Sequence, residues 1–445
     1  MKVDMLAKIM AFRNHQGFLK YLKNTSWMMA EQLLRIIAGL FVGIWVARYL
    51  GPEQFGIFSY AIAFTAIFAG IAKLGLDGVV VRELVNHPDK GDAYLGTAFW
   101  LKIVGAVIVM GCMALIIPFT SNDSTTNLFI FIIAAGLIFQ SFEVVEFYFQ
   151  SQVMAKIISI CKVTQLAISS CVKVYLVLSQ ADLIWFVCVT TFDTFGLAIG
   201  YFIAYRTKKS LVFFGKFDFY IAKALLLNSW PLIVSNLVIM IYMRIDQIMI
   251  KEMLGGYDVG IYSAAVRLSE AWYFFPTLIT ASLFPAILNA KKTNEALYYG
   301  RLQNLYTFMV LISLAVAIPV TFLSDEVIGL LYGVRFNGAG DVLMVHVWAG
   351  LIVGLGLARG KWILAENLQV YTFVFLSAGL VTNVVANYLW IPIYGIEGAA
   401  YATVLAQAMG TLVFPLFIKK TRVSFHMMVR ALILFDVFDF IRKRS

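Results

Sequence analysis

Charged side chains interrupt long apolar stretches of this chain, and their spacing limits the chemistry they could perform. Glu31 and Arg35 are four residues apart and Arg267 and Glu270 are three apart, so each pair shares one helical face. A charge at the centre of a bilayer costs about 2.5–3.5 kcal/mol, so such groups face a cavity or one another. Either the acids neutralise the arginines locally, or the guanidinium groups exchange a carboxylate for a phosphate in a wet cavity.

A second pattern is a polar stripe formed by Lys162, Gln165, Ser169 and Lys173. At roughly 100° per helical residue, these four positions fall within about 80° of arc. The stripe could line a cavity and hydrogen-bond to sugar hydroxyls or to phosphate. Alternatively, the two lysines extend their ammonium groups to opposite membrane surfaces. Both interpretations remain open at this point.

Two aspartates are candidates for binding a coupling cation, either H⁺ or Na⁺. Asp193 lies in the middle of an apolar stretch and needs a partner. Asp246 shares a helical face with Tyr242, whereas Arg244 is about 160° away and cannot pair with it inside one helix. Asp246 also lies near the end of its stretch, so an interfacial role is the alternative. Histidines and cysteines are scattered without ligand spacing, so neither a metal site nor a cofactor is predicted.

The elements that must position these groups are membrane helices. Hydrophobic residues make up 61% of the chain and charged residues 13%, which is far too apolar for a soluble protein. A bilayer core about 30 Å thick needs roughly 20 apolar residues per helix, and the runs are too continuous for the strands of a barrel. The all-α prediction has twelve spans: 24–48, 55–77, 93–118, 127–149, 157–179, 182–205, 224–250, 257–288, 302–324, 342–360, 369–392 and 397–418.

Basic residues predict the orientation of these spans, because short loops rich in Lys and Arg stay on the cytoplasmic side. With the N-terminus inside, the outer loops contain only Arg48, Lys251 and Arg335, whereas the inner segments contain most of the remaining basic residues. Both termini are therefore expected in the cytoplasm. The formal net charge of +10 reflects this topology, and a nucleic-acid partner is not expected.

Short loops leave no room for a soluble catalytic domain. The predicted domain boundaries therefore lie at the ends of the predicted spans. Residues 424–441 mix large apolar side chains with Arg430, Asp436 and Asp439, which predicts a helix lying on the inner membrane surface. A thirteenth span is the alternative. The predicted domains are an amphipathic N-terminus (1–23), an N-lobe (24–205), a linker (206–223), a C-lobe (224–418) and a basic tail (419–445).

An internal repeat divides the spans into two sets of six. "LGPEQFGIFSYA" from Leu50 recurs as "LGGYDVGIYSAA" from Leu254, at an offset of 204 residues and with six of twelve positions identical. Six intervening spans are an even number, so both copies enter the membrane in the same direction. Parallel repeats of this kind build two-lobed transporters that work by alternating access.

Several longer segments carry a resemblance to a known family. These segments are "ARYLGPEQFGIFSYAIAF" from Ala47, "WPLIVSNL" from Trp230, "RIDQIMI" from Arg244 and "NYLWIPIYGIEGAAYAT" from Asn387. The whole chain resembles the bacterial polysaccharide-transporter family, the Wzx type of O-antigen flippase, in the superfamily that also contains MATE exporters and the lipid II flippase MurJ. The motifs are mostly glycine, proline and aromatic positions, so they specify the family better than the cargo.

The resemblance implies a two-lobed flippase of the bacterial inner membrane. Its cargo would be an undecaprenyl-diphosphate-linked oligosaccharide, moved from the cytoplasmic to the periplasmic leaflet. A polysaccharide polymerase and a chain-length regulator would be its protein partners. The lipid II flippase also carries arginine in the corresponding part of its first span, which by analogy favours Arg35 as a headgroup ligand.

Two other function classes compete with this interpretation. A MATE-type exporter of small molecules, driven by a cation, would share the architecture but would favour carboxylates and aromatic residues over arginine in its cavity. A membrane polymerase or glycosyltransferase would need an activated acid, base or metal site near an interface. No outer loop gathers such residues, so a transporter is the main prediction.

Overall fold

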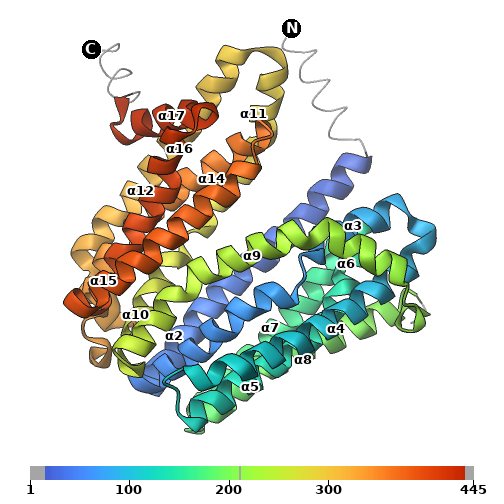
Figure 1. Cartoon of the computed structure of the whole chain (residues 1–445), viewed down its shortest axis with the longest axis horizontal. Helices are drawn as coiled ribbons and strands as arrows, with labels where there is room; N and C mark the ends of the chain where they lie inside the picture. Colours follow the sequence, from blue (N-terminus) through green and yellow to red (C-terminus); the bar gives the residue numbers. More distant parts are fainter. Residues whose placement is uncertain (1–15, 210–211, 436–445) are drawn as a thin grey trace. The chain divides into compact units, whose positions relative to one another are not determined.

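The computed structural model describes residues 16–209 and 212–435, and the regular elements within these ranges are helices (Figure 1). This confirms the all-α class. Residues 1–15, 210–211 and 436–445, which belong to the predicted N-terminus, linker and tail, lie outside the described part. The α-helices are α2 (Gln16–Ala72), α3 (Leu76–Asn86), α4 (Gly91–Ile116), α5 (Ser124–Phe139), α6 (Glu143–Ser151), α7 (Ala155–Leu178), α8 (Leu183–Arg206), α9 (Phe219–Met253), α10 (Gly256–Ala271), α11 (Phe274–Thr293), α12 (Glu295–Leu331), α13 (Ala339–His346), α14 (Ala349–Ala365), α15 (Val370–Ala408), α16 (Phe414–Phe417) and α17 (Arg422–Leu432).

Ten helical segments in the described part are long and apolar enough to cross a membrane. Two of them, Asn24–Asn86 and Val370–Phe417, have 63 and 48 residues, about two or three times the length of one crossing. Each contains a glycine with a positive φ, Gly51 at 74° and Gly395 at 60°, where the helix bends. These lengths allow the twelve crossings expected from the sequence, and their exact number remains a prediction.

Contacts between residues divide the chain into two compact units. The first contains Met1–Val46 and Phe64–Leu237, and the second contains Ala47–Ala63 and Val238–Ser445. Helices α2 and α9 therefore each contribute to both units. The predicted N-lobe (24–205) and C-lobe (224–418) were divided between predicted spans and remain predictions, whereas the division into units falls inside α2 and α9.

Each unit has its own apolar core. In the first unit, α3, α4, α6 and α8 bury side chains such as Val80, Phe149 and Tyr201. In the second, α12, α14 and α15 pack around residues such as Leu302 and Leu355. Within a bilayer, such packing stabilises each unit through close van der Waals contact between helices, because lipid tails are as apolar as the side chains that they would otherwise cover.

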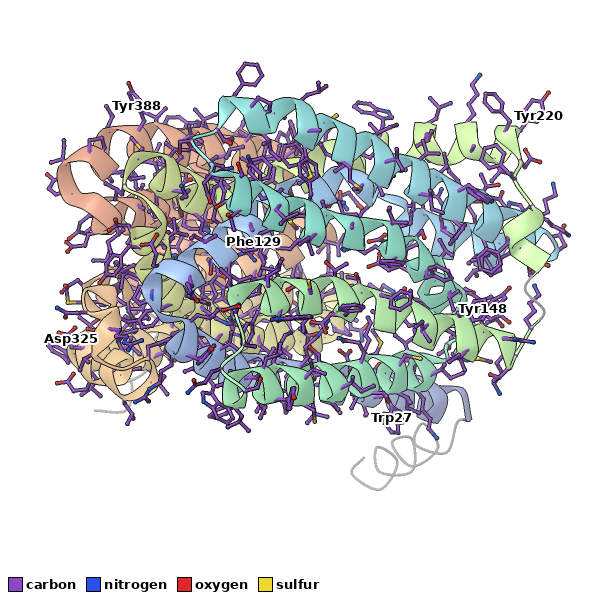
Figure 2. All side chains as sticks on the ribbon, turned by 90° about the horizontal axis from the view of Figure 1, so that it is seen from below. Trp27, Phe129, Tyr148, Tyr220, Asp325 and Tyr388 are labelled. Carbon is purple, nitrogen blue, oxygen red and sulfur yellow. The ribbon has the colours of Figure 1, made fainter. Side chains whose placement is uncertain are left out.

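The exposed surface of the described residues is also rich in large apolar side chains. Figure 2 shows Tyr220 and Tyr388 projecting away from the helices, and these side chains are 84% and 69% exposed. Aromatic side chains are common at membrane interfaces, where their rings lie among lipid headgroups. The exposed apolar surface therefore fits a lipid environment.

The two predicted repeat copies contact each other within the second unit. A Cβ atom added to Gly56 would lie 1.8 Å from the carbonyl oxygen of Gly256, and one added to Gly260 would lie 2.0 Å from that of Pro52. Gly260 is the residue 204 positions after Gly56, and Gly256 the one 204 positions after Pro52. The contact is therefore reciprocal between equivalent positions, and small residues allow the two backbones to approach this closely.

The short helix α17 packs on α12 in the second unit. The hydroxyl groups of Tyr306 and Ser424 are hydrogen-bonded at 2.8 Å, and Gln303 donates to the carbonyl of Met427 at 3.2 Å. With eleven residues, α17 is about 16 Å long and too short to span a bilayer core. The described part of the tail is thus helical, whereas residues 436–441 of the predicted surface helix lie outside the described residues, so the choice between a surface helix and a thirteenth span remains a prediction.

Replacing Gly56 with Ala should destabilise the protein, because the new methyl group collides with backbone atoms that cannot move independently. Overpacking of this kind costs about 1–3 kcal/mol, measurable as a lower midpoint of thermal unfolding in detergent. Gly111→Ala in α4 is the matched control, since its added Cβ meets no atom within 4 Å. Equal unfolding midpoints for the two variants would contradict the close contact.

Candidate functional site

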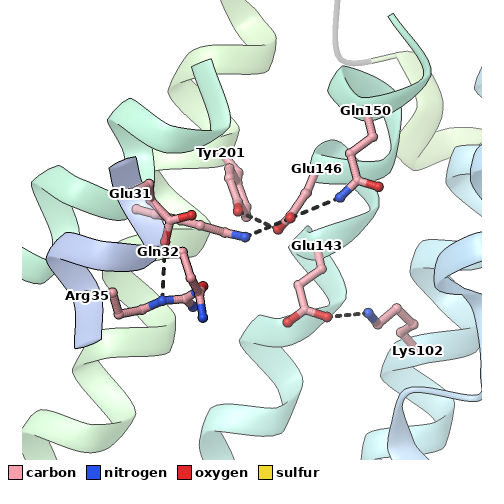
Figure 3. Close-up of polar contacts among 9 residues, drawn as sticks. Glu31, Gln32, Arg35, Lys102, Glu143, Glu146, Gln150 and Tyr201 are labelled. Carbon is pink, nitrogen blue, oxygen red and sulfur yellow. Dashed lines mark hydrogen bonds and ion pairs between the residues drawn. The ribbon is translucent and has the colours of Figure 1, made fainter. Parts of the chain in front are cut away.

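Helix α6 places two carboxylates one turn apart inside the first unit (Figure 3). Glu143 accepts from the ammonium group of Lys102 on α4 at 2.7 Å, and the Lys102 side chain is only 2% exposed. Burial of a lysine in an apolar core is costly unless a carboxylate neutralises it. The ion pair therefore explains how α4 can carry a buried cation.

Glu146 joins three helices of the same unit. It accepts from Lys162 on α7 at 2.7 Å and from the Tyr201 hydroxyl on α8 at 2.6 Å, and Gln150 donates to it at 3.1 Å. Figure 3 shows the side chains of Tyr201 and Gln150 directed at the Glu146 carboxylate. Lys162, predicted from the sequence as part of a ligand-binding stripe, is thus already neutralised.

Arg35 has its polar partners on its own helix. Its Nε atom lies 3.2 Å from Glu31 Oε1, and the guanidinium also donates to the Gln32 side chain (Figure 3). The Arg35 side chain is 49% exposed and that of Glu31 only 8%. The acid therefore lies inside the protein, while half of the arginine side chain remains accessible.

Two further residues of the stripe, Gln165 and Ser169, border a groove between α7 and α8. Gln165, Ser169 and Asp193 line this space of about 530 Å³, whose other walls are mainly isoleucine, valine and phenylalanine. Asp193 accepts from Gln165 at 2.9 Å and from Lys173 at 2.8 Å. The structure thus brings together three predicted site residues from two helices, and Asp193 has the partner that its position demanded.

Asp246 lies at the centre of a buried polar cluster in the second unit, with 7% of its surface exposed. Its carboxylate accepts from the Tyr262 hydroxyl at 2.7 Å, from the Thr403 hydroxyl at 2.6 Å and from the Asn387 amide at 2.6 Å. These donors come from α10 and from both halves of α15, and all three are neutral. Hydrogen bonds stabilise a carboxylate in such a position without cancelling its charge.

Further polar groups extend the Asp246 cluster. The Asn387 amide also donates to Asn383 Oδ1 at 3.2 Å, while Asn387 Oδ1 is buried without a partner in the structure. A buried acceptor without a donor is costly, and this oxygen belongs to the same side chain whose amide nitrogen binds Asp246. His346, hydrogen-bonded to Ser269 at 2.8 Å, lies close enough to Asp246 for electrostatic coupling.

Arg267 and Glu270 both lie on α10. The two side chains differ from each other in exposure and in their charged neighbours. The Arg267 side chain is exposed and Glu270 is half-buried. Glu270 interacts electrostatically with Arg244 and Asp246, and Arg267 with Tyr332 and Arg244. Direct pairing of Arg267 with Glu270 remains a prediction.

One buried cation was missed by the sequence analysis. Arg359 on α14 is 7% exposed, donates to the carbonyls of Gly410 and Thr411 at 2.8 Å, and lies 4.7 Å from the centre of the Phe375 ring. The two carbonyls belong to a π-helical turn, Met409–Val413, in which the regular α-helical bonding is interrupted. The sequence indicates this residue only as an isolated arginine within the tenth predicted span, 342–360.

The described part of the chain contains no cluster of three histidine, cysteine, aspartate or glutamate side chains that could hold a metal ion. The candidate site therefore consists of cations paired with carboxylates in the first unit, and of an acid with neutral donors in the second. Such groups can exchange partners with charged ligands.

Comparison with known proteins agrees with this fold. Residues 21–291 match the family described as "Polysaccharide biosynthesis protein". Two relatives from Haloferax volcanii are similar over most of their length. "Probable flippase AglR" is 26% identical over 409 residues, which cover 88% of this chain and 82% of the relative. "Probable low-salt glycan biosynthesis flippase Agl15" is 25% identical over 385 residues, covering 84% and 79%.

Two solved structures share the architecture. An inward-facing MATE multidrug transporter of the MOP superfamily superposes with a TM-score of 0.71 at 17% identity, covering 90% of this chain and 95% of that one. The lipid II flippase MurJ in an inward closed conformation gives 0.70 at 16% identity, covering 93% and 92%. These similarities confirm the MATE and MurJ-like fold expected from the sequence.

Replacing Lys102 with Met should destabilise the first unit, because Glu143 would lose its counter-charge inside the protein. Loss of one partner of a buried pair costs about 3–5 kcal/mol. The double variant Lys102→Met/Glu143→Gln should recover most of the lost thermal stability, measured by unfolding in detergent. Lys209→Met is the control, since its pair with Asp92 is more exposed and should matter little. If the double variant is no more stable than the single one, the pair does not carry the stability.

Proposed function

Because the chain belongs to the polysaccharide biosynthesis protein family, we propose that it is a flippase for an undecaprenyl-diphosphate-linked oligosaccharide. The relatives named as flippases align over most of both chains, and this is the observation that carries the proposal. The cargo would move from the cytoplasmic to the periplasmic leaflet by alternating access. These relatives are named as flippases and not as enzymes, which supports transport rather than catalysis.

A diphosphate headgroup needs cationic ligands to leave water, and Arg35 and Arg267 are the leading candidates. Both side chains are accessible although they lie in apolar helices. Guanidinium binds phosphate through two parallel hydrogen bonds, so an incoming diphosphate can replace Glu31 as the partner of Arg35. The carboxylate keeps the arginine neutralised when no cargo is bound.

The polar stripe would complete the headgroup site. Lys162 and Lys173 are each paired with one carboxylate, and Gln165 and Ser169 border the α7–α8 groove between them. Amide and hydroxyl groups hydrogen-bond well to sugar hydroxyls. These residues therefore serve the glycan, while the lysines provide further positive charge for the phosphates.

The direction of transport follows from the proposed orientation. Basic loops and termini favour a cytoplasmic location of both chain ends in the bacterial inner membrane. The glycan is assembled on the cytoplasmic face in this scheme, and a polymerase with its chain-length regulator would use it on the other. These proteins are the proposed partners.

The Asp246 cluster would couple transport to a cation, with H⁺ or Na⁺ as the ligand. A cation binding at the carboxylate and Asn387 Oδ1 would neutralise the charge and supply the missing partner. Because Tyr262, Asn387 and Thr403 come from α10 and α15, occupancy would change how these helices pack. Glu270, which interacts with the same carboxylate, would adjust its affinity.

Arg35→Ala and Arg267→Ala should each reduce translocation of a labelled undecaprenyl-diphosphate glycan in proteoliposomes. A charge-assisted hydrogen bond contributes about 1.5–3 kcal/mol, which corresponds to a loss of roughly tenfold to a hundredfold. Arg82→Ala is the control, because Arg82 pairs with the neighbouring Glu83 at the surface. Unchanged transport by both test variants, with normal insertion, would overturn the cationic headgroup site.

Asp246→Asn should abolish the response of transport to an imposed Na⁺ or H⁺ gradient, because the neutral amide has no negative charge to attract Na⁺ and cannot take up a proton as the carboxylate can. The measurement is the translocation rate with and without the gradient. Asp182→Asn is the control, being an exposed acid at the start of α8. A persisting gradient response in Asp246→Asn would exclude this carboxylate as the coupling group.

A further inference from the structure

An aromatic pocket of about 980 Å³ lies in the second unit, between the end of α13 and the bend of α15. Its lining combines four aromatic side chains with one carboxylate, namely Trp348, Trp390, Tyr394, Tyr401 and Glu397. None of these groups belongs to the sites proposed above for cargo or for the coupling cation. The pocket therefore joins aromatic rings with a single negative charge.

The carboxylate of Glu397 is not neutralised by the protein. Within residues 16–209 and 212–435, it forms no ion pair and no hydrogen bond, and the side chain is half-buried. The faces of tryptophan and tyrosine rings are themselves negative, so they attract cations. The charge of the pocket thus favours an ammonium group over a neutral or an anionic ligand.

Two tyrosines supply hydrogen-bond donors beside this carboxylate. Tyr401 is four residues after Glu397, so the two side chains share one face of α15. The ring centres of Tyr394 and Tyr401 are 6.2 Å apart, and these side chains are 55% and 42% exposed. Phenolic hydroxyls donate to phosphate oxygens. The pocket therefore offers partners for both charges of a zwitterionic headgroup.

A tryptophan is held in place on another wall of the pocket. The indole N–H of Trp348 donates to the Thr321 hydroxyl on α12 at 3.1 Å. Thr321 also lines the pocket, together with Met344 and Val345 of α13. This wall is thus positioned by the fold and does not require a ligand to form.

The lining changes from polar to apolar along α15. Glu397 and Tyr401 are followed by Val404, Leu405 and Ala408, which also line the pocket. At roughly 100° per residue, these five positions fall within about 100° of arc. Ala408 lies about 16 Å further along the helix than Glu397, which is half the thickness of a bilayer core. A soluble amine would leave the apolar part uncovered, whereas a lipid covers both parts.

We propose that this pocket binds an aminophospholipid of the phosphatidylethanolamine type from the surrounding leaflet. Glu397 pairs with the ammonium group, the hydroxyls of Tyr394 and Tyr401 donate to the phosphodiester, and the acyl chains lie along Leu405 and Ala408. The basic loops predict that this leaflet is the outer one, because the bend of α15 separates the eleventh and twelfth predicted spans. The lipid thus connects α13 to α15.

The test measures lipid binding to the purified full-length protein by native mass spectrometry, with phosphatidylethanolamine or phosphatidylglycerol of the same acyl chains. Phosphatidylethanolamine should bind about tenfold more tightly, since phosphatidylglycerol has no ammonium group for the carboxylate. Glu397→Gln should remove this preference, because the amide keeps the size of the side chain but not its charge. Tyr394→Phe/Tyr401→Phe should weaken binding of both lipids, since both contain the phosphodiester.

Glu326→Gln is the matched control, since it removes an exposed carboxylate of the same unit that does not line the pocket. A retained preference in this control, together with its loss in Glu397→Gln, supports the site. Equal binding of the two lipids by the unaltered protein, or an unchanged preference in Glu397→Gln, overturns it. Displacement of phosphatidylethanolamine by soluble ethanolamine at equal concentration would assign the pocket to a small amine and also overturn the proposal.

The outcome is independent of the proposed flippase activity, because binding is measured without transport. If the arginine variants at positions 35 and 267 transport normally, the preference for phosphatidylethanolamine is still expected. If that preference is absent, the proposed headgroup site for the cargo is unaffected.

Discussion

Water is absent from the centre of a bilayer, so a charge that the chain carries there must find its partner within the protein or its cargo. The structure meets this requirement in two ways. In the first unit, Lys102, Lys162 and Lys173 are each paired with a carboxylate from another helix. In the second, Asp246 is surrounded by neutral donors. The first arrangement suits exchange of one anion for another, and the second suits binding of a cation.

Spacing along the sequence predicts neighbours on one helix much better than neighbours on different helices. The four-residue separation of Glu31 and Arg35 indicated a shared face, and the structure has that ion pair. The partners of Lys162 and Lys173 come from α6 and α8, and no periodicity along α7 contains that information. The pair formed by Lys102 and Glu143 also joins two helices, α4 and α6, and the spacing along either helix does not predict it.

The all-α membrane class could be predicted from the sequence, because the length of an apolar run is a direct consequence of bilayer thickness. Local irregularities of the backbone could not be predicted, since they depend on tertiary contacts. The π-helical turn at Met409–Val413 leaves carbonyl groups that Arg359 satisfies, so the irregular backbone and the buried cation explain each other. Neither one predicts the other from sequence, because the two lie about fifty residues apart and on different helices.

The sharing of α2 between the two units has a consequence for how the protein can be divided. Residues 47–63 are encoded in the first half of the chain but pack in the second unit, where Gly56 meets Gly256. A polypeptide containing only the first half would leave that segment without its neighbours. Separately encoded halves would therefore have to associate before residues 47–63 could pack, in the manner of a segment exchanged between subunits.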